Sequence, residues 1–293
     1  MRVVTVIVNR RSGTSTDESR AKVAAAFARA GLEPQMIVVD GDKIRGAAEA
    51  AAAAGHAIVA AGGDGTVSTV AAVAVATGVT FGVIPLGTLN HFAKDAGIPL
   101  DVDAAVAVIA GGHVVALDTG ELNGRTFVNN ASVGFYARIV RARQLEQRRG
   151  RSKWIALAIG LVREARRFSQ ITVRMTIDGQ PVVRTTPFVF VGNGEYIDEG
   201  PGVGGRSSIT AGHLWIALAP ECGRLQMLQL VVRAIAGRLT DDVRLEEFRG
   251  LDVTIEPRGQ MGGVAMDGEL SPATPPFSCI CRPAALHTLL PSS

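Results

Sequence analysis

The chemistry indicated by this sequence centres on a five-residue motif, Gly62-Gly63-Asp64-Gly65-Thr66. An apolar run, residues 56–61, precedes it, and the residues from Val67 onward predict a helix. Glycines let backbone N–H groups approach an anion, and a helix N-terminus adds unpaired N–H groups and partial positive charge. The motif therefore predicts a phosphate-binding turn, in which the Asp64 carboxylate would serve a Mg²⁺ ion, a nucleophile or a proton. The alternative is an ordinary strand-to-helix turn capped by Asp64.

A second polar loop follows the next apolar run of the chain. Residues 85–93 read Pro-Leu-Gly-Thr-Leu-Asn-His-Phe-Ala, and they come after residues 79–84, which predict a buried strand. The side chains of Thr88 and Asn90 can donate hydrogen bonds to phosphate oxygens. The alternative is a helix start capped by Thr88. Two polar turns at corresponding strand ends favour the phosphate site.

Two carboxylates late in the chain flank one glycine, in Met266-Asp267-Gly268-Glu269. The short apolar run before them places the pair at the end of a strand. Such a pair can bind Mg²⁺ or act as a general base that takes a proton from a hydroxyl group. An ordinary Asp-Gly hairpin turn would have the same local sequence.

The elements that position the first two loops alternate between strand and helix. β-Branched and apolar runs predict the strands, and alanine-rich stretches that stop at Gly31 and Gly55 predict helices. This alternation predicts an α/β fold, with a doubly wound parallel sheet and helices on both faces. Its loops 9–14, 62–66 and 85–92 would lie beyond the carboxyl ends of the strands, where such sheets bind ligands. The predicted strands are 2–8, 35–39, 56–61 and 79–84, and the predicted helices are 16–30, 43–54, 67–76 and a short one ending near 96.

Strand-like runs dominate from about residue 114, and Asn123-Gly124 and Asp178-Gly179 indicate hairpins. We therefore expect an α/β domain over 1–113, to which 283–293 returns, and an antiparallel β-rich, sandwich-like domain over 114–282. The predicted strands are 114–122, 125–131, 171–177, 182–191, 213–219, 243–248, 251–255, 264–266 and 277–281. The predicted helices are 135–148, 152–167, 224–237 and a short one over 283–290.

The composition excludes several classes of protein. The chain has 293 residues, of which 47% are apolar, enough for substantial cores. Cys222, Cys279 and Cys281 give no disulfide framework, and the five scattered histidines show no zinc spacing. The long apolar run after Gly65 contains Gly and Pro residues, which argue against a membrane span. We expect a soluble, cytoplasmic protein without a nucleic acid partner, and a homodimer is left open.

The positive charge of the chain is concentrated in one segment. Residues 138–167 hold ten Lys or Arg and two Glu, a net charge of +8, whereas the whole chain carries +3. Trp154 lies among these cations and is followed by apolar residues. This composition suits transient peripheral contact with an anionic membrane, at the inner face of the cell membrane. The alternative is a solvated helix whose apolar stripe packs on the β-rich domain.

Taken together, these motifs resemble the catalytic family of diacylglycerol kinases, which includes bacterial lipid kinases and, more distantly, sphingosine and ceramide kinases. The resemblance covers nearly the whole chain, in the right order. It rests on Asn9-Arg10-Arg11-Ser12-Gly13, on the motif at 62–66, on the loop at 85–93, on Gly192-Asn193-Gly194 and on the turn at 267–269. The motif at 62–66 is shared with NAD kinases and phosphofructokinases. The resemblance is therefore specific only because this motif occurs together with the loop at 85–93 and the turn at 267–269.

The resemblance implies a lipid kinase that uses ATP and Mg²⁺ and whose acceptor is a lipid bound at the cleft between the two domains. Asp64 would help position Mg²⁺-ATP or the acceptor hydroxyl, and Glu269, with Asp267, would be the base. Family members differ over which carboxylate takes the proton. The implied nucleotide-binding residues are Asn9, Arg10, Arg11, Ser12, Gly13, Gly62, Gly63, Asp64, Gly65, Thr66, Val67, Thr88 and Asn90.

The sequence departs from the family pattern at two places. Arg10 replaces the usual proline of the first loop, which changes its stiffness and adds a cation. Thr210-Ala211 replaces an Asp-Asp pair that holds a structural Mg²⁺ in bacterial relatives, so we expect that metal site to be lost. The loss motivates an alternative function, a non-catalytic lipid- or nucleotide-binding protein. An NAD kinase-like enzyme is a further alternative, which the loop at 85–93 disfavours.

Overall fold

The computed structural model describes residues 3–10, 17–148, 159, 170–196, 205–221, 223, 225–226, 245–259 and 263–292. The chain forms two compact units. The first consists of Met1–Thr119, Ser208–Thr210 and Arg282–Ser293. The second consists of Gly120–Ser207 and Ala211–Cys281.

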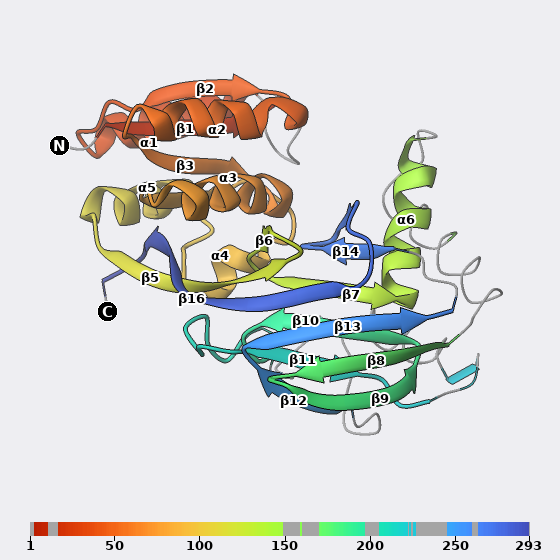
Figure 1. Ribbon diagram of the computed structural model, residues 1–293. Helices are drawn as coiled ribbons and strands as arrows, with labels where there is room; N and C mark the ends of the chain where they lie inside the picture. Colours follow the sequence, from red (N-terminus) through yellow and green to blue (C-terminus); the bar gives the residue numbers. More distant parts are fainter. Residues whose placement is uncertain are drawn as a thin grey trace. The chain divides into compact units, whose positions relative to one another are not determined.

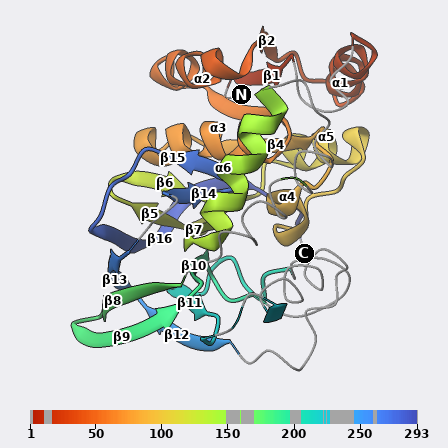
Figure 2. The same cartoon turned by 90° about the vertical axis from the view of Figure 1, so that its right-hand side faces the viewer.

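The first unit contains a parallel sheet with the strand order β2-β1-β3-β4. Helices α2 and α3 pack together on one face of this sheet, and α1 and α5 pack together on the other (Figures 1 and 2). This arrangement confirms the doubly wound α/β fold. The strands are β1 (Val4–Asn9), β2 (Gln35–Val39), β3 (Ala57–Gly62) and β4 (Phe81–Pro85). The helices are α1 (Asp17–Arg29), the 3-10 turn η1 (Gly41–Lys43), α2 (Ile44–Ala53), α3 (Asp64–Thr77), α4 (His91–Asp95) and α5 (Val102–Gly111).

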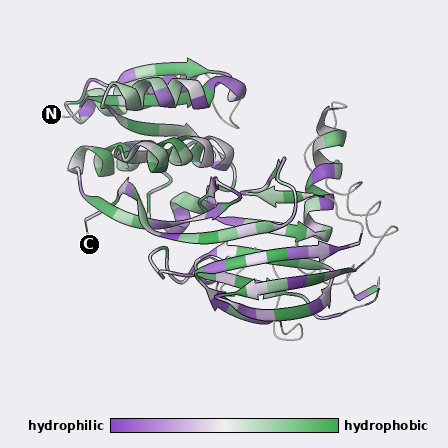
Figure 3. Cartoon of the chain, viewed as in Figure 1, coloured by the Kyte–Doolittle hydropathy of each residue, from purple (hydrophilic) through white to green (hydrophobic). Residues whose placement is uncertain are grey.

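The central strands of this sheet are buried on both faces, as expected where helices cover both sides. Every residue of β3 is buried, and Figure 3 shows the hydrophobic character of that strand. Sequence reasoning missed α5, although its signals are present. The side chain of Asp101 accepts a hydrogen bond from the N–H of Ala104 and caps the helix start, and Gly112 ends it in the left-handed conformation.

The second unit is an antiparallel β sandwich. One layer has the strand order β12-β11-β10-β7-β14-β15, and the other includes β13, β8, β9 and the first part of β16. Apolar side chains from both layers form one buried core, which includes Met175, Val189, Leu214, Val253 and Phe277. The elements of the first layer are β7 (Asn130–Gly134), β10 (Phe188–Asn193), β11 (Leu214–Leu218), β12 (Glu246–Gly250), β14 (Val264–Met266) and β15 (Glu269–Ser271). The remaining elements of the second unit are β6 (Arg125–Phe127), α6 (Phe135–Arg148), β8 (Ile171–Ile177), β9 (Gln180–Thr186) and β13 (Asp252–Arg258). Two further strands, β5 (Val114–Leu122) and β16 (Phe277–Leu289), each have residues in both units.

The helix predicted over 283–290 is wrong, because these residues continue strand β16. In the first unit, Thr288 pairs with Phe81 of β4 in a parallel register, and the N–H of Leu290 donates to the carbonyl oxygen of His113. Pairing with an existing sheet edge outweighs the weak local helix preference of a segment that begins at Pro283. Strand β16 thus contributes its first part to the second unit and its last part to the first.

Several other boundaries differ from the prediction. The predicted strand 125–131 is divided between β6 and β7, and the predicted strand 182–191 is divided between β9 and β10. Helix α3 starts at Asp64 instead of residue 67, so the glycine-rich motif forms the first turn of the helix. The helices predicted at 152–167 and 224–237 lie almost entirely outside the described residues.

Candidate active site

Three loops of the first unit follow neighbouring parallel strands, and they therefore emerge at the same edge of the sheet. Strand β1 ends at Asn9, β3 at Gly62 and β4 at Pro85, and β3 pairs with both of the others. The side-chain amide of Asn9 donates a hydrogen bond to Thr66 Oγ1 at 3.1 Å. The first and second predicted nucleotide loops are thus joined by a direct contact.

The glycine-rich motif makes the N-terminus of α3. Gly63 is the N-cap, and its carbonyl oxygen accepts hydrogen bonds from the N–H groups of Thr66 and Val67 at 2.9 and 3.0 Å. An ideal Cβ at Gly62 would lie 2.5 Å from Thr66 Oγ1, so no larger residue fits without moving this buried threonine. The motif therefore needs glycine for close packing at the start of a helix whose dipole favours an anion.

The side chain of Asp64 has one buried oxygen without a partner. Among the residues that the structure describes, none forms a hydrogen bond with its Oδ1 atom, which is removed from solvent. A buried acceptor is normally satisfied, and an exception calls for an explanation such as an ion or a bound group. This atom lies at the N-terminus of α3, within the predicted phosphate-binding turn.

The loop after β4 is closed by Asn90. Its Oδ1 atom accepts a hydrogen bond from the N–H of Gly87 at 3.0 Å, and its Nδ2 atom donates to the Gly87 carbonyl oxygen at 2.9 Å. Asn90 adopts the left-handed conformation with φ of 51°. Asn90 thus shapes the loop, whereas Thr88 is exposed. Of the first loop, Arg10 is exposed, and the predicted contacts Arg11, Ser12 and Gly13 lie outside the described residues.

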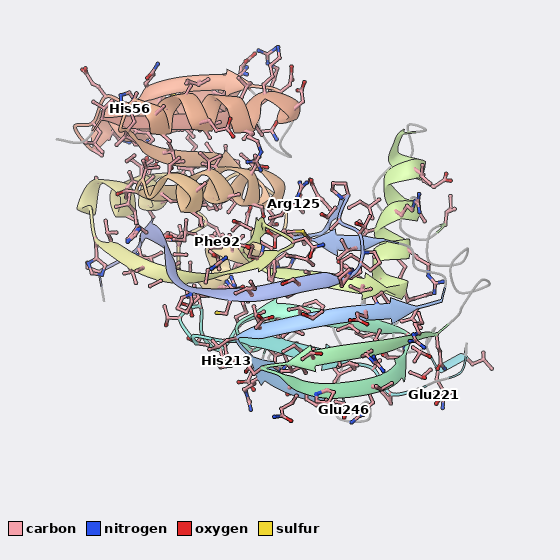
Figure 4. All side chains as sticks on the ribbon, in the orientation of Figure 1. His56, Phe92, Arg125, His213, Glu221 and Glu246 are labelled. Carbon is pink, nitrogen blue, oxygen red and sulfur yellow. The ribbon has the colours of Figure 1, made fainter. Side chains whose placement is uncertain are left out.

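The short helix α4 is fixed by an aromatic contact. The ring of Phe92, labelled in Figure 4, packs edge-on against that of Phe81 on β4, with centroids 6.0 Å apart and an interplanar angle of 65°. Both rings are buried. The loop 86–90 is therefore anchored at one end by its strand and at the other by Phe92.

The two carboxylates of the second unit have different surroundings. Asp267 accepts three main-chain hydrogen bonds, from the N–H groups of Val128 at 3.0 Å, Asn129 at 2.8 Å and Asn130 at 3.1 Å. Glu269 begins β15, pairs with Met266 across the turn, and is exposed. An oxygen that already accepts main-chain N–H groups is poorly placed to take a proton from a substrate, so this geometry favours Glu269 as the base.

Sequence reasoning missed a group of polar residues behind this turn. Arg206 donates to the carbonyl oxygens of Val128 and Asn193, and the Asn193 side chain also donates to Val128 O at 3.1 Å. The hydroxyl group of Tyr196 donates to Asn129 O at 3.2 Å. The loop at 192–194 indicated a site here, but Arg206 had no signal in the sequence.

The segment in which the structural Mg²⁺ was expected to be lost is held by main-chain and side-chain hydrogen bonds. The N–H of Thr210 donates to Ser208 Oγ at 3.1 Å, and Ile209 O accepts from the N–H of Asp118 at 3.1 Å. Ala211 O lies 2.9 Å from Nδ1 of His213, which Figure 4 labels. Neither Thr210 nor Ala211 has a carboxylate to offer a metal ion. Within the described parts of the chain, no helix is long and apolar enough to cross a membrane.

Comparison with protein families assigns both parts of the chain. Residues 3–122 match the diacylglycerol kinase catalytic domain. Residues 129–290 match the YegS C-terminal NAD kinase beta sandwich-like domain. Two structures of putative diacylglycerol kinases from Bacillus anthracis superpose on 99% of the chain, with TM-scores of 0.78 and 0.74. Each is 22% identical, and the matches cover 95% and 97% of those chains, so they establish the shared fold.

Curated relatives are similar over different lengths. An uncharacterized protein of Synechocystis is 31% identical over 80% of this chain and 54% of its own. A probable YegS-like lipid kinase of Pseudomonas aeruginosa is 41% identical over 47% of this chain and 46% of its own. The chain thus spans about half the length of these two relatives. A probable YegS-like lipid kinase of Pseudomonas putida is 32% identical over 86% of this chain and 83% of its own.

Proposed function

Because the chain belongs to the family of YegS-like lipid kinases, with their diacylglycerol kinase-type catalytic domain, we propose that it transfers a phosphoryl group from ATP to a hydroxyl group of diacylglycerol or a related lipid. The observation that carries the proposal is the buried, unpartnered Oδ1 atom of Asp64 at the N-terminus of α3, as judged over the described residues. A phosphate-binding turn that also presents a carboxylate suits a metal-bound nucleotide better than a free anion.

The residues of the first unit would bind the nucleotide. The α3 N-terminus offers N–H groups and partial positive charge to the phosphates, and Thr88 offers an exposed hydroxyl group. Asn9 would hold Thr66 and the glycine-rich turn in place. Asn90 would act indirectly, by fixing the loop from which Thr88 reaches the phosphates.

Asp64 fits a magnesium ion that arrives with ATP. Mg²⁺ binds hard oxygen ligands, commonly one or two carboxylates together with substrate phosphates, and Asp64 Oδ1 is such an oxygen. When bound, the ion would neutralise charge on the phosphates during transfer.

Glu269 would act as the general base. Its carboxylate would accept the proton of the lipid hydroxyl group while that oxygen attacks the terminal phosphorus of ATP, and the bond to the bridging oxygen would break to release ADP. Asp267 would position the turn by holding residues 128–130. Phosphoryl transfer is catalysed mostly by positioning and charge stabilisation, so few reacting side chains are needed.

A lipid acceptor requires contact with a membrane. The cationic segment 138–167 is the proposed contact surface, through attraction to anionic lipids. Helix α6 includes the exposed Arg141 of this segment, whereas the part from 149 onward lies outside the described residues, Ile159 excepted. This docking would bring the protein to the inner face of the cell membrane.

A non-catalytic role as a lipid- or nucleotide-binding protein is the second candidate. It is motivated by Thr210 and Ala211, where carboxylates are missing. Transfer of radiolabelled phosphate from ATP to diacylglycerol, sphingoid base, ceramide and phosphatidylglycerol distinguishes the two. Labelling of one of these lipids supports the kinase. Nucleotide binding with no label in any of the four lipids would support the non-catalytic role.

A further inference from the structure

Arg206 is a buried cation whose guanidinium group lies among oxygen atoms of neighbouring residues. It is only 7% exposed. Its Nη1 atom donates to Val128 O at 2.7 Å and to Asn193 O at 3.0 Å, and its Nη2 atom lies 3.4 Å from Asn129 Oδ1. Burying a guanidinium group is costly unless its donors are satisfied. Here the contacts fix the orientation of two consecutive residues, Val128 and Asn129.

The same short segment is also bound to a carboxylate, that of the partly buried Asp267. The N–H groups of Val128, Asn129 and Asn130 donate to the carboxylate of Asp267. The N–H of Asp267 donates in return to Asn130 O at 2.8 Å. Residues 128–130 thus connect a cation, which holds the Val128 carbonyl group, with an anion, which holds the N–H groups.

Asp267 in turn determines where Glu269 lies. The two residues belong to one tight turn, in which Asp267 and Gly268 have φ of 46° and 78° and Met266 pairs with Glu269. A turn with two such residues has little conformational freedom once one of them is held. A displacement of residues 128–130 is therefore passed to Glu269 through the Asp267 hydrogen bonds.

We infer that Arg206 is a positioning residue for Glu269 and acts through residues 128–130 and Asp267. The inference rests on the proposed function, in which Glu269 takes the proton of the acceptor. Lysine keeps the charge but cannot form the two-armed contact of the guanidinium group with Val128, Asn193 and Asn129. Methionine fills a similar volume without donors, and it leaves the Val128 carbonyl group with one fewer partner.

The kinetic test compares Arg206→Lys and Arg206→Met with the wild type, using ATP and the accepted lipid. Arg206→Met is expected to lower kcat at least about tenfold, because the base would be misplaced. A tenfold loss corresponds to a barrier higher by roughly 1.4 kcal/mol. The kcat of Arg206→Lys should lie between those of the wild type and Arg206→Met. The KM for ATP should be unchanged in both variants. The control is Arg174→Met, which removes an exposed arginine of β8 and should keep the wild-type kcat. A wild-type kcat in Arg206→Met would overturn the inference.

Hydrogen exchange tests the same link without any activity. In Arg206→Met, amides of residues 128–130 and 266–269 should exchange about tenfold faster, while those of β3 in the first unit keep their rates. Unchanged exchange at 266–269 contradicts the inference, and faster exchange there with normal kcat reduces Arg206 to a structural role. If the wild type transfers no phosphate, the proposed function fails, and exchange alone decides whether Arg206 holds this turn. If Arg206→Met does not fold, Arg206→Lys is used in both experiments.

Discussion

Gly87 lies so close to Gly63 that a methyl group on Gly87 would stand 2.6 Å from the Cα atom of Gly63. The two glycines belong to different loops, which follow β4 and β3. The N–H of Leu86 donates to Gly62 O at 2.9 Å, so the loops are bonded as well as packed. The two predicted nucleotide loops can therefore touch here only because Gly87 lacks a side chain.

Gly87→Ala is expected to push these loops apart and weaken ATP binding. A contact this short with main-chain atoms requires a backbone shift, and overpacking of this kind typically costs about 1–3 kcal/mol. The Kd for ATP, measured by calorimetry, should rise about tenfold or more. Gly46→Ala is the control, because a methyl group there meets nothing within 4 Å on helix α2 and should stabilise the helix. Wild-type ATP affinity in Gly87→Ala would show that the loops do not form the nucleotide site.

Asp267→Asn is expected to destabilise the second unit. The amide has one accepting oxygen in place of two, and its NH₂ group would face a main-chain N–H donor. Each buried donor left without an acceptor costs about 1–3 kcal/mol. The free energy of unfolding, measured by urea titration, should fall by about that amount. Glu256→Gln, which removes an exposed charge from β13, should change it by less than about 0.5 kcal/mol. Equal stabilities of the two variants would contradict the anchoring role of Asp267.

Cys279 is expected to be unreactive in the folded protein. Burial, with a smaller contribution from the charge of Asp252, raises the pKa of its thiol from 9.0 to about 12. The reactive thiolate is thus scarce at pH 8, and iodoacetamide should label the Cys279 peptide only after denaturation. Because the folded pKa is the higher one, this thiol lowers stability as the pH rises from 9 toward 12. Cys279→Val should reduce that loss. Equal labelling of folded and unfolded protein would disprove the burial argument.

The cationic segment provides a test of membrane contact. Changing Arg148, Arg149 and Arg151 to Glu should weaken binding to anionic vesicles, since each cation near such a surface adds about 1 kcal/mol. Activity on short-chain lipid in neutral detergent should barely change. A matched control reverses three exposed arginines of the second unit, Arg125, Arg174 and Arg258, and gives the same change in net charge. If both triple variants bind vesicles like the wild type at low salt, another surface contacts the membrane.

Local sequence patterns were sufficient for much of the fold. The bounds of β2, β5, β8, β14 and α6 were predicted to the residue, and β8 shows why, because its residues alternate strictly between buried and exposed positions. The same reasoning failed for β16, whose last part is a strand only because it pairs with β4. Local preference does not indicate such a partner, which lies far away in the sequence.

The residues of the candidate site likewise include some that local sequence patterns indicate and others that only distant contacts reveal. Asp64 and Glu269 were found from motifs with local signatures, a glycine-rich helix start and an Asp-Gly turn. The bonds from Asp267 to residues 128–130 and from Arg206 to Val128 join residues far apart in the chain. No spacing rule predicts contacts of this range, so the proposed roles of Asp267, which positions the turn, and of Glu269, the base, could be distinguished only with the structure. The roles of all these site residues, Asp64 and Glu269 included, stay predictions.

In the proposed mechanism, Asp64 and Glu269 carry out phosphoryl transfer from ATP to a lipid. The most direct measurement is the rate at which Asp64→Asn and Glu269→Gln form phosphorylated lipid, detected by mass spectrometry and compared with the wild type and with Glu256→Gln. Both site variants should lose at least about a hundredfold in rate while keeping their fold. Glu269 is the proposed base, and a positioned base contributes roughly 10²–10⁴-fold. Asp64 is the proposed ligand of the magnesium ion that neutralises the phosphates. Glu256→Gln should match the wild type. Retention of more than about a tenth of the wild-type rate by either site variant would contradict its catalytic role.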